Sequence, residues 1–215
     1  MNTFNYESYR GSYQYEALNS RNPVQRFWHQ KKLEFVKAKL GLLNGKKVLD
    51  VGCGSGHLCF ALASSCKTMV GIDISRNAIE FAQHMQQDLN VHNVTFIKTE
   101  SGSFPFPSES FEVVIMMELI EHLENPAILL TEALRVLKRG GRLFVTTPNY
   151  RSCWPIVEFL LDYFRLTPPL KGHQHISKFN STILRKFLEA ELTISEQGSF
   201  YIVSPFLSSY WPLAH

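Results

Sequence analysis

Short apolar runs alternate along this chain with stretches whose apolar residues recur at helical spacing. The apolar runs predict five strands, at 46–51, 68–73, 93–98, 111–117 and 141–147. The amphipathic stretches between them predict helices at 56–66, 75–89 and 126–138. The run Val113-Val114-Ile115-Met116-Met117 is continuously apolar, which is typical of a parallel sheet covered on both faces. Because parallel strands are joined by right-handed crossovers, the pattern predicts an α/β protein with a doubly wound, mostly parallel sheet.

The two ends of the chain depart from this alternation. Residues 1–24 are rich in Tyr, Ser and Asn without helical periodicity, so they form either a loosely packed terminal arm or a lid over a ligand. Residues 24–43 carry an apolar stripe and predict a helix, in which Trp28 and His29 either pack in the core or reach the cleft. After Pro148 we expect helices at 152–166 and 180–190 and two strands near 192–205.

Three alternating glycines follow the first predicted strand, in Gly52-Cys53-Gly54-Ser55-Gly56-His57. Glycine allows positive φ and close approach of the backbone to a ligand, and the helix that follows attracts negative charge at its N-terminus. A dinucleotide fingerprint counted from Gly52 would place its third glycine at His57, whereas Gly56 stands one position earlier. The spacing therefore disfavours NAD and favours a smaller adenosine ligand.

A carboxylate ends the second predicted strand, at Asp73. The carboxyl ends of parallel strands meet at one edge of a sheet, so Asp73 is expected near the glycine loop, where it can accept hydrogen bonds from both hydroxyls of a ribose. A strand-terminal Asp is also a common helix cap, and Ser75 and Asn77 are further capping candidates. Together with the glycine loop, Asp73 indicates a cofactor site.

The stretch from Lys46 to Pro148 resembles the class I S-adenosylmethionine-dependent methyltransferases. The resemblance is carried by four segments: Val48-Leu49-Asp50-Val51-Gly52-Cys53-Gly54-Ser55-Gly56, Gly71-Ile72-Asp73-Ile74-Ser75, Phe104-Pro105-Phe106-Pro107-Ser108-Glu109-Ser110-Phe111-Glu112-Val113-Val114 and Leu134-Arg135-Val136-Leu137-Lys138-Arg139-Gly140-Gly141. In that family the glycine loop and the acid matching Asp50 cradle the methionine part of the cofactor, and the acid matching Asp73 binds the ribose. Glu100 and Glu112 stand where the family usually has Asp, which keeps the charge.

The resemblance implies S-adenosylmethionine as the cofactor. We expect its site to combine the glycine loop with the strand ends beside it: Asp50, Gly52, Cys53, Gly54, Gly56, His57, Asp73, Ile74, Glu100, Ser101, Met117 and Glu118.

The resemblance also implies a Rossmann-like fold of seven strands with an antiparallel edge and a helical insert after strand five. We therefore expect one methyltransferase domain in four parts. These are an N-terminal arm and helix, a cofactor-binding core, a substrate cap, and the antiparallel edge with a tail: 1–45, 46–148, 149–191 and 192–215.

The acceptor side is expected at Glu118-Leu119-Ile120-Glu121-His122, directly after the fourth strand. On a helix, Glu118, Glu121 and His122 would share one face. The pattern resembles the ubiquinone-biosynthesis O-methyltransferases, and the nearby Thr146-Thr147-Pro148-Asn149 either lines the acceptor pocket or is an ordinary turn. Because an oxygen acceptor needs a base to remove its proton, we expect Glu121, His122 and the later His175 to be catalytic residues, without a metal.

Two alternatives stay open at this point. Small-RNA 3′-terminal 2′-O-methyltransferases carry a similar Glu-x-x-Glu-His and a later His that bind a divalent metal. By that resemblance, Mg²⁺ or Mn²⁺ would be held by Glu118, Glu121, His122 and His175. The other alternative is a non-catalytic interaction module, which the intact glycine loop argues against.

Charge and composition restrict the classes of binding partner that we expect. The net charge of +3 is small and the basic residues are dispersed, so a nucleic-acid partner is not expected. The cluster Lys138-Arg139-Gly140-Gly141-Arg142 is interpreted as a helix end with a glycine cap. Aromatic residues are dense around the expected cap, which favours a small, partly apolar acceptor. The four cysteines show no metal-like spacing, and no secretory or membrane-spanning segment is apparent, so we expect a cytoplasmic location.

Overall fold

The computed structural model describes residues 10–100, 102–151, 163 and 176–198. The predicted helix at 152–166, apart from Tyr163, and the site residues Ser101 and His175 lie outside these described residues.

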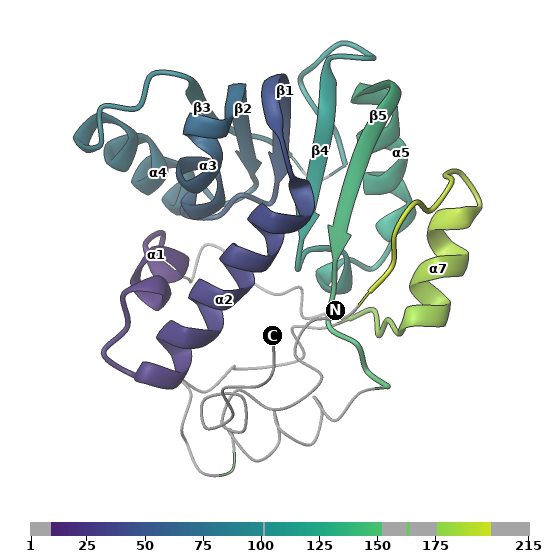
Figure 1. The fold of residues 1–215 in the computed structure, drawn as a ribbon, viewed down its shortest axis with the longest axis horizontal. Helices are drawn as coiled ribbons and strands as arrows, with labels where there is room; N and C mark the ends of the chain where they lie inside the picture. The colour runs from purple at the N-terminus through teal and green to yellow at the C-terminus, as the bar shows by residue number, and fades with distance from the viewer. Residues whose placement is uncertain (1–9, 101, 152–162, 164–175, 199–215) are drawn as a thin grey trace.

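Five parallel strands form one sheet in the order β3-β2-β1-β4-β5 (Figure 1). Their bounds are Leu43–Val51 for β1, Cys66–Asp73 for β2, Val94–Lys98 for β3, Phe111–Met117 for β4 and Leu137–Thr146 for β5. β2 and β3 are added in turn on one side of β1, and β4 and β5 are then added on the other side. This reversal places a topological switch point between β1 and β4, where ligands bind at the carboxyl ends of the strands. The predicted doubly wound parallel sheet is confirmed.

Helices cover both faces of this sheet (Figure 1). One face is covered by α2 (Pro23–Leu40), α3 (His57–Leu62), which continues into the 3₁₀ turn η2 (Ala63–Ser65), and α4 (Arg76–Asp88). The other face is covered by α5 (Pro126–Val136), with side chains of α7 (Ser181–Glu189) packed against the same core. Two further elements, α1 (Tyr13–Leu18) and the 3₁₀ turn η3 (Ile120–His122), lie near the carboxyl ends of the strands.

A hydrophobic core lies on each face of the sheet, which explains why the central strands are continuously apolar. Along β4, Val113 and Ile115 belong to the core under α2, α3 and α4, whereas Val114 and Met116 belong to the core under α5. Successive side chains of a strand point to opposite faces, and here both faces are buried. The burial of these apolar side chains, each worth about 1.5 to 3 kcal/mol, fixes the sheet between its helices.

The region before α2 differs from the sequence prediction. Residues 13–18 form α1, although no helical periodicity was expected there. Ala17 is buried, and the ring of Tyr15 packs against that of Phe81 on α4, with 5.8 Å between centroids. A helix of six residues is too short to show a period, and it is held by these tertiary contacts.

The boundary between α5 and β5 also differs. The predicted helix 126–138 ends at Val136, because Leu137 already pairs with Phe111 of β4. Lys138 and Arg139 therefore lie in β5, where their side chains pair with Glu112 and Glu109. The interpretation of this basic cluster as a capped helix end is wrong.

The predicted antiparallel edge is not found in the described part of the chain. Two strands were expected near 192–205; residues 192–198 form neither strand nor helix, and 199–205 lie outside the described residues. The sheet has five strands among the described residues, all parallel, instead of the expected seven.

Candidate cofactor and acceptor site

The glycine loop between β1 and α3 is held in a conformation that residues with side chains rarely adopt. Gly52, Gly54 and Gly56 have φ of 74°, 51° and 76°, in the left-handed region. A Cβ on Gly56 would lie 2.5 Å from the ring of Phe96, and one on Gly52 would lie 2.9 Å from Leu119. The amides of Gly52 and Cys53 both donate to the carbonyl of Ile72, at 2.8 and 3.0 Å. These contacts tie the loop to the end of β2.

Asp73 links this loop to the start of α4. Its Oδ2 accepts from the amide of Gly54 and its Oδ1 from the amide of Ser75, each at 2.8 Å. Ser75 itself caps α4 by accepting from the amide of Ala78. Each carboxylate oxygen has two lone pairs, so a carboxylate can accept several hydrogen bonds at once. Asp73 is partly exposed at the carboxyl end of β2, as a ribose-binding acid requires.

Asp50 lies buried at the end of β1, with only 3% of its surface exposed. Burial raises its pKa from 3.8 to about 7; a hydrogen bond from the Cys59 thiol, at 3.4 Å, opposes this rise, and the charge of Asp73 adds to it. Burial also raises the pKa of the Cys53 and Cys59 thiols, which are free. Near neutral pH, Asp50 is therefore poised between its neutral and charged forms.

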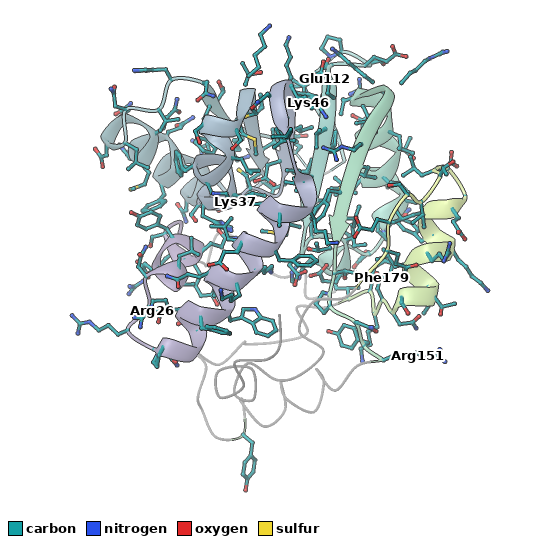
Figure 2. All side chains as sticks on the ribbon, viewed as in Figure 1. Arg26, Lys37, Lys46, Glu112, Arg151 and Phe179 are labelled. Atoms are coloured by element: carbon teal, nitrogen blue, oxygen red, sulfur yellow. The ribbon has the colours of Figure 1, made fainter. Side chains whose placement is uncertain are left out.

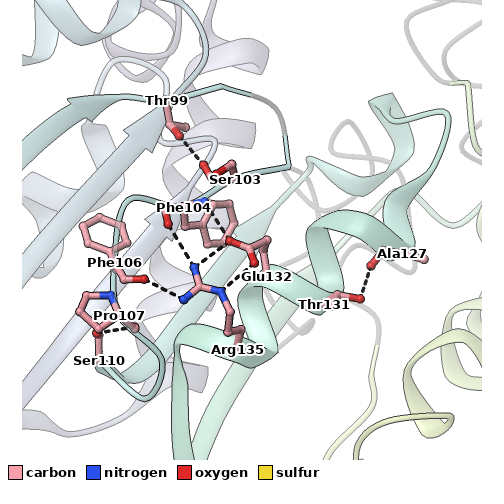
Figure 3. Close-up of polar contacts among 10 residues, drawn as sticks. All are labelled: Thr99, Ser103, Phe104, Phe106, Pro107, Ser110, Ala127, Thr131, Glu132 and Arg135. Carbon is pink, nitrogen blue, oxygen red and sulfur yellow. Dashed lines mark hydrogen bonds and ion pairs between the residues drawn. The ribbon is translucent and has the colours of Figure 1, made fainter.

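A clamp on α5 fixes the segment that follows Glu100 (Figure 3). Arg135 donates to the carbonyls of Phe104 and Phe106, at 3.1 and 2.7 Å, and to the carboxylate of Glu132. Glu132 in turn accepts from the amide of Phe104 at 2.9 Å. The bonds from Arg135 hold the pKa of Glu132 down, at about 2. Glu100, which precedes this segment in the chain, is exposed, and so is Ile74, which follows β2.

Glu112 has a structural role at the opposite end of the sheet. Figure 2 shows its side chain together with that of Lys46 where β1 and β4 begin, away from the carboxyl ends of the strands. The carboxylate accepts from the amide of Lys47 and from Lys138, and the bond from Lys138 lowers its pKa. The Glu that replaces the family's usual Asp therefore ties β1, β4 and β5 together.

Glu118 follows β4 in a left-handed conformation, with φ of 50°. Its Oε1 accepts from the hydroxyl of Thr146 at 2.9 Å, and its Oε2 lies 3.3 Å from Nζ of Lys32 on α2. Glu118 is thus held between β5 and α2, beside Met117 at the end of β4.

The expected helical face of Glu118, Glu121 and His122 does not form. Only residues 120–122 are helical, as a single 3₁₀ turn, and Glu118 precedes it in a left-handed conformation. Glu121 is fully buried, its carboxylate oxygens have no hydrogen-bond partner among the described residues, and Nε2 of His122 lies 3.9 Å away. Burial, and then the charge of Glu118, raise the pKa of Glu121 to about 8, so it carries a proton near neutral pH.

Among the described residues, no group of three or more His, Cys, Asp or Glu side chains is placed to hold a metal ion. The fourth member of the alternative metal set, His175, lies outside the described residues.

The sequence analysis missed two residues that reach the site. Lys32 pairs with Glu118, and Gln14 on α1 accepts through Oε1 from the amide of Ser55, at 2.8 Å, with its carboxamide lying on Gly54. His29 lies three residues before Lys32 on the same face of α2, and burial, then Lys32, lower its pKa to about 4. Polar residues at helical spacing on the half-buried face of α2 were the signal that could have revealed Lys32.

The residues at this edge fit an S-adenosyl cofactor. The left-handed glycines place backbone without side chains at the carboxyl ends of β1 and β2, and the partly exposed carboxylate of Asp73 lies beside them. Nδ1 of His57 is buried beside the loop with no protein partner among the described residues, so it is available to a ligand.

Comparison with known proteins identifies the family. The family model described as a methyltransferase domain matches residues 42–190, and the chain belongs to that family. This confirms the class of S-adenosylmethionine-dependent methyltransferases that the resemblance indicated.

Among curated proteins, the chain is similar to bacterial ubiquinone biosynthesis O-methyltransferases. It is 34% identical to that of Thiobacillus denitrificans over 137 residues, covering 63% of this chain and 55% of the relative. It is 29% identical to that of Pasteurella multocida over 213 residues, covering 92% and 83%. The chain thus spans about half the length of the first of these relatives.

Several solved structures share the fold. YcgJ of Bacillus subtilis superposes with a TM-score of 0.62 at 26% identity, covering 75% of this chain and 68% of that one. Magnesium protoporphyrin IX methyltransferase of Synechocystis, solved with bound SAH, gives a TM-score of 0.68 at 22% identity, covering 90% of each chain. The second likeness concerns the fold alone.

None of the helices within residues 10–100, 102–151, 163 and 176–198 combines the length and the apolar character needed to cross a membrane.

Proposed function

We propose that this protein binds S-adenosylmethionine at the carboxyl ends of β1 and β2 and methylates an oxygen atom of a small, partly apolar acceptor. The observation that carries the proposal is the joint placement of the left-handed glycine loop and Asp73, linked by the hydrogen bond from Gly54. Similarity to O-methyltransferases over 92% of the chain supports oxygen as the acceptor atom.

The chain's own residues divide the work as follows. Asp73 holds the ribose hydroxyls, Gly52 to Gly56 accommodate the methionine part, and the segment fixed by Arg135 borders the adenine. When bound, the cofactor supplies an electrophilic methyl group. His122 is the base that takes the proton of the acceptor hydroxyl, and the neighbouring Glu121, protonated near neutral pH, is unsuited to that task.

The acceptor is proposed to lie over β4 and β5, between η3 and Thr146. Glu121, buried and neutral, and the apolar surroundings of η3 suit a partly apolar molecule better than a polyanion. An RNA acceptor would instead give binding that weakens steeply with salt, which separates the two classes in one titration.

Calorimetric titration with S-adenosylmethionine and S-adenosylhomocysteine tests the cofactor. We expect both to bind the wild-type protein and Asp73→Asn to weaken binding by at least about tenfold, since hydrogen bonds to a charged group contribute about 1.5 to 3 kcal/mol. Asp88→Asn, at the exposed end of α4, is the matched control and should bind like the wild type. Failure of a folded wild-type sample to bind either ligand would refute the proposal.

Turnover tests the base. Phenolic acceptors of varied apolar character are screened with the cofactor, with and without a chelator. His122→Asn should lose turnover while keeping the wild-type affinity for S-adenosylhomocysteine. Full turnover by His122→Asn would show that another group takes the proton.

A further inference from the structure

The turn that carries His122 is short. η3 is a single 3₁₀ turn, in which the amide of His122 donates to the carbonyl of Leu119 at 3.1 Å. Hydrogen bonds in such turns have poorer geometry than those of an α-helix, and a single turn is not stable by itself. Ile120 is buried in the core under α5, which anchors the start of the turn. The end of the turn, where His122 lies, therefore depends on contacts from outside it.

Two residues from a later part of the chain supply such contacts. The amides of Ile176 and Ser177 both donate to the carbonyl of Glu121, at 2.8 and 2.9 Å. The hydroxyl of Ser177 donates to the carbonyl of Leu123 at 2.8 Å. Glu121 and Leu123 are the neighbours of His122 in the chain, so these bonds fix the backbone on both sides of that residue.

The two donors belong to a strap, residues 176–179, that is itself anchored. Phe179 is buried in the core under α5, and its carbonyl accepts from the amide of Tyr150 at 2.9 Å. The next residue, Asn180, caps α7, because its side chain accepts from two amides of the first turn. The strap is therefore fixed by the core and by a helix, and it joins η3 to the segment that follows β5.

The place of an imidazole depends on the backbone that carries it, because few staggered rotamers are open to the side chain. A base has to lie within about 3 Å of the proton that it takes, and a displacement of about 1 Å can lower the rate about 100-fold. We propose that Ser177 is a positioning residue that holds His122 in place for the acceptor hydroxyl, through its bonds to the carbonyls on either side. This inference rests on the proposed function, in which His122 is the base.

NMR spectra of protein labelled with ¹³C at histidine Cε1 test the positioning without cofactor or acceptor. The signal of His122 is the one that His122→Asn lacks. Ser177→Ala deletes the bond to the carbonyl of Leu123 and keeps both amide bonds to Glu121, so the His122 signal should shift or broaden in a folded protein. The signal of His84, exposed on α4, should stay in place and reports that the rest of the fold is unchanged.

Kinetics test the consequence for the reaction. With the phenol that the wild type methylates fastest, Ser177→Ala should lower kcat by about 3- to 30-fold, and leave KM and the affinity for S-adenosylhomocysteine within about twofold. Ser177→Thr keeps the hydroxyl and should restore at least about half of the wild-type kcat. Ser181→Ala is the matched control, because Ser181 is exposed at the start of α7, and it should behave like the wild type in both measurements.

An unchanged His122 signal in Ser177→Ala, or a loss of kcat that Ser177→Thr does not reverse, would overturn the inference. So would a loss confined to KM or to S-adenosylhomocysteine binding, since it would place Ser177 in ligand binding instead. Should Ser177→Ala not fold, Ser177→Cys replaces it, because a thiol fills the same space but donates weakly, and the same outcomes apply. If the wild type methylates no phenol, or if His122→Asn keeps full turnover, it is the proposed function that fails. The His122 signal then still decides whether Ser177 positions this residue.

Discussion

At Gly56 in the glycine loop, the effect of adding a single methyl group on the free energy of unfolding can be estimated from the structure. Its φ of 76° is unfavourable for any residue with a Cβ, by about 1 to 2 kcal/mol. The added Cβ would also lie 2.5 Å from Cζ of Phe96 and 3.2 Å from Cβ of Ala82, in a buried and well-packed region. Overpacking of this kind costs about 1 to 3 kcal/mol more. We therefore expect Gly56→Ala to lower the free energy of unfolding by about 2 to 5 kcal/mol.

Gly45→Ala separates the two contributions. Gly45 has nearly the same φ, 75°, but a Cβ there would meet no atom within 4 Å. It should therefore lose only the backbone part, about 1 to 2 kcal/mol. Urea unfolding followed by circular dichroism measures both variants against the wild type. In a double-mutant cycle, Phe96→Leu should recover at least about 1 kcal/mol in the Gly56→Ala background. Equal losses at the two glycines, without recovery, would refute the packing argument.

Two further predictions concern Asp50 and Arg135. Asp50→Asn should gain stability relative to the wild type as the pH rises from about 4 to about 8, because the wild-type carboxyl ionises at 3.8 when unfolded but only at about 7 when folded. At about 1.4 kcal/mol per pH unit, the difference between the free energies of unfolding of the variant and the wild type approaches about 4 kcal/mol. Urea titrations at these pH values measure it, and a difference that does not change with pH would contradict the raised pKa of Asp50. Arg135→Met should lower the free energy of unfolding by about 1 to 3 kcal/mol, since it removes bonds to the carbonyls of Phe104 and Phe106. Arg139→Met, which loses only an exposed pair with Glu109, is its control, and an equal effect in thermal unfolding would mean that the clamp contributes nothing.

The glycine loop and Asp73 could be predicted because their chemistry depends on local sequence. Glycine is the residue that most readily takes positive φ, and a carboxylate at the end of a parallel strand lies at the binding edge of a doubly wound sheet. The observed φ values and the bond from Gly54 to Asp73 agree with both expectations.

Expectations that depended on a helical period were less successful. The spacing of Glu118, Glu121 and His122 suits a helix, but the left-handed Glu118 is tied to Thr146 and breaks the period. Lys138 and Arg139 extend an apparently helical run, yet pairing between β4 and β5 draws them into a strand. In both cases hydrogen bonds to a neighbouring strand outweigh a local preference that amounts to less than about 1 kcal/mol per residue.

The sequence by itself predicted the strands along the chain and the two buried faces of the sheet, because apolar periodicity is a local property. The family followed from a resemblance carried by four segments of the chain. Only the tertiary structure decided that Lys32 meets Glu118, that Gln14 covers Gly54 and that Glu121 is buried and protonated. These contacts join segments far apart in the chain, and the pKa of a carboxyl depends on the groups packed around it. The architecture is thus encoded in local patterns, whereas the electrostatics of the site arise from long-range packing.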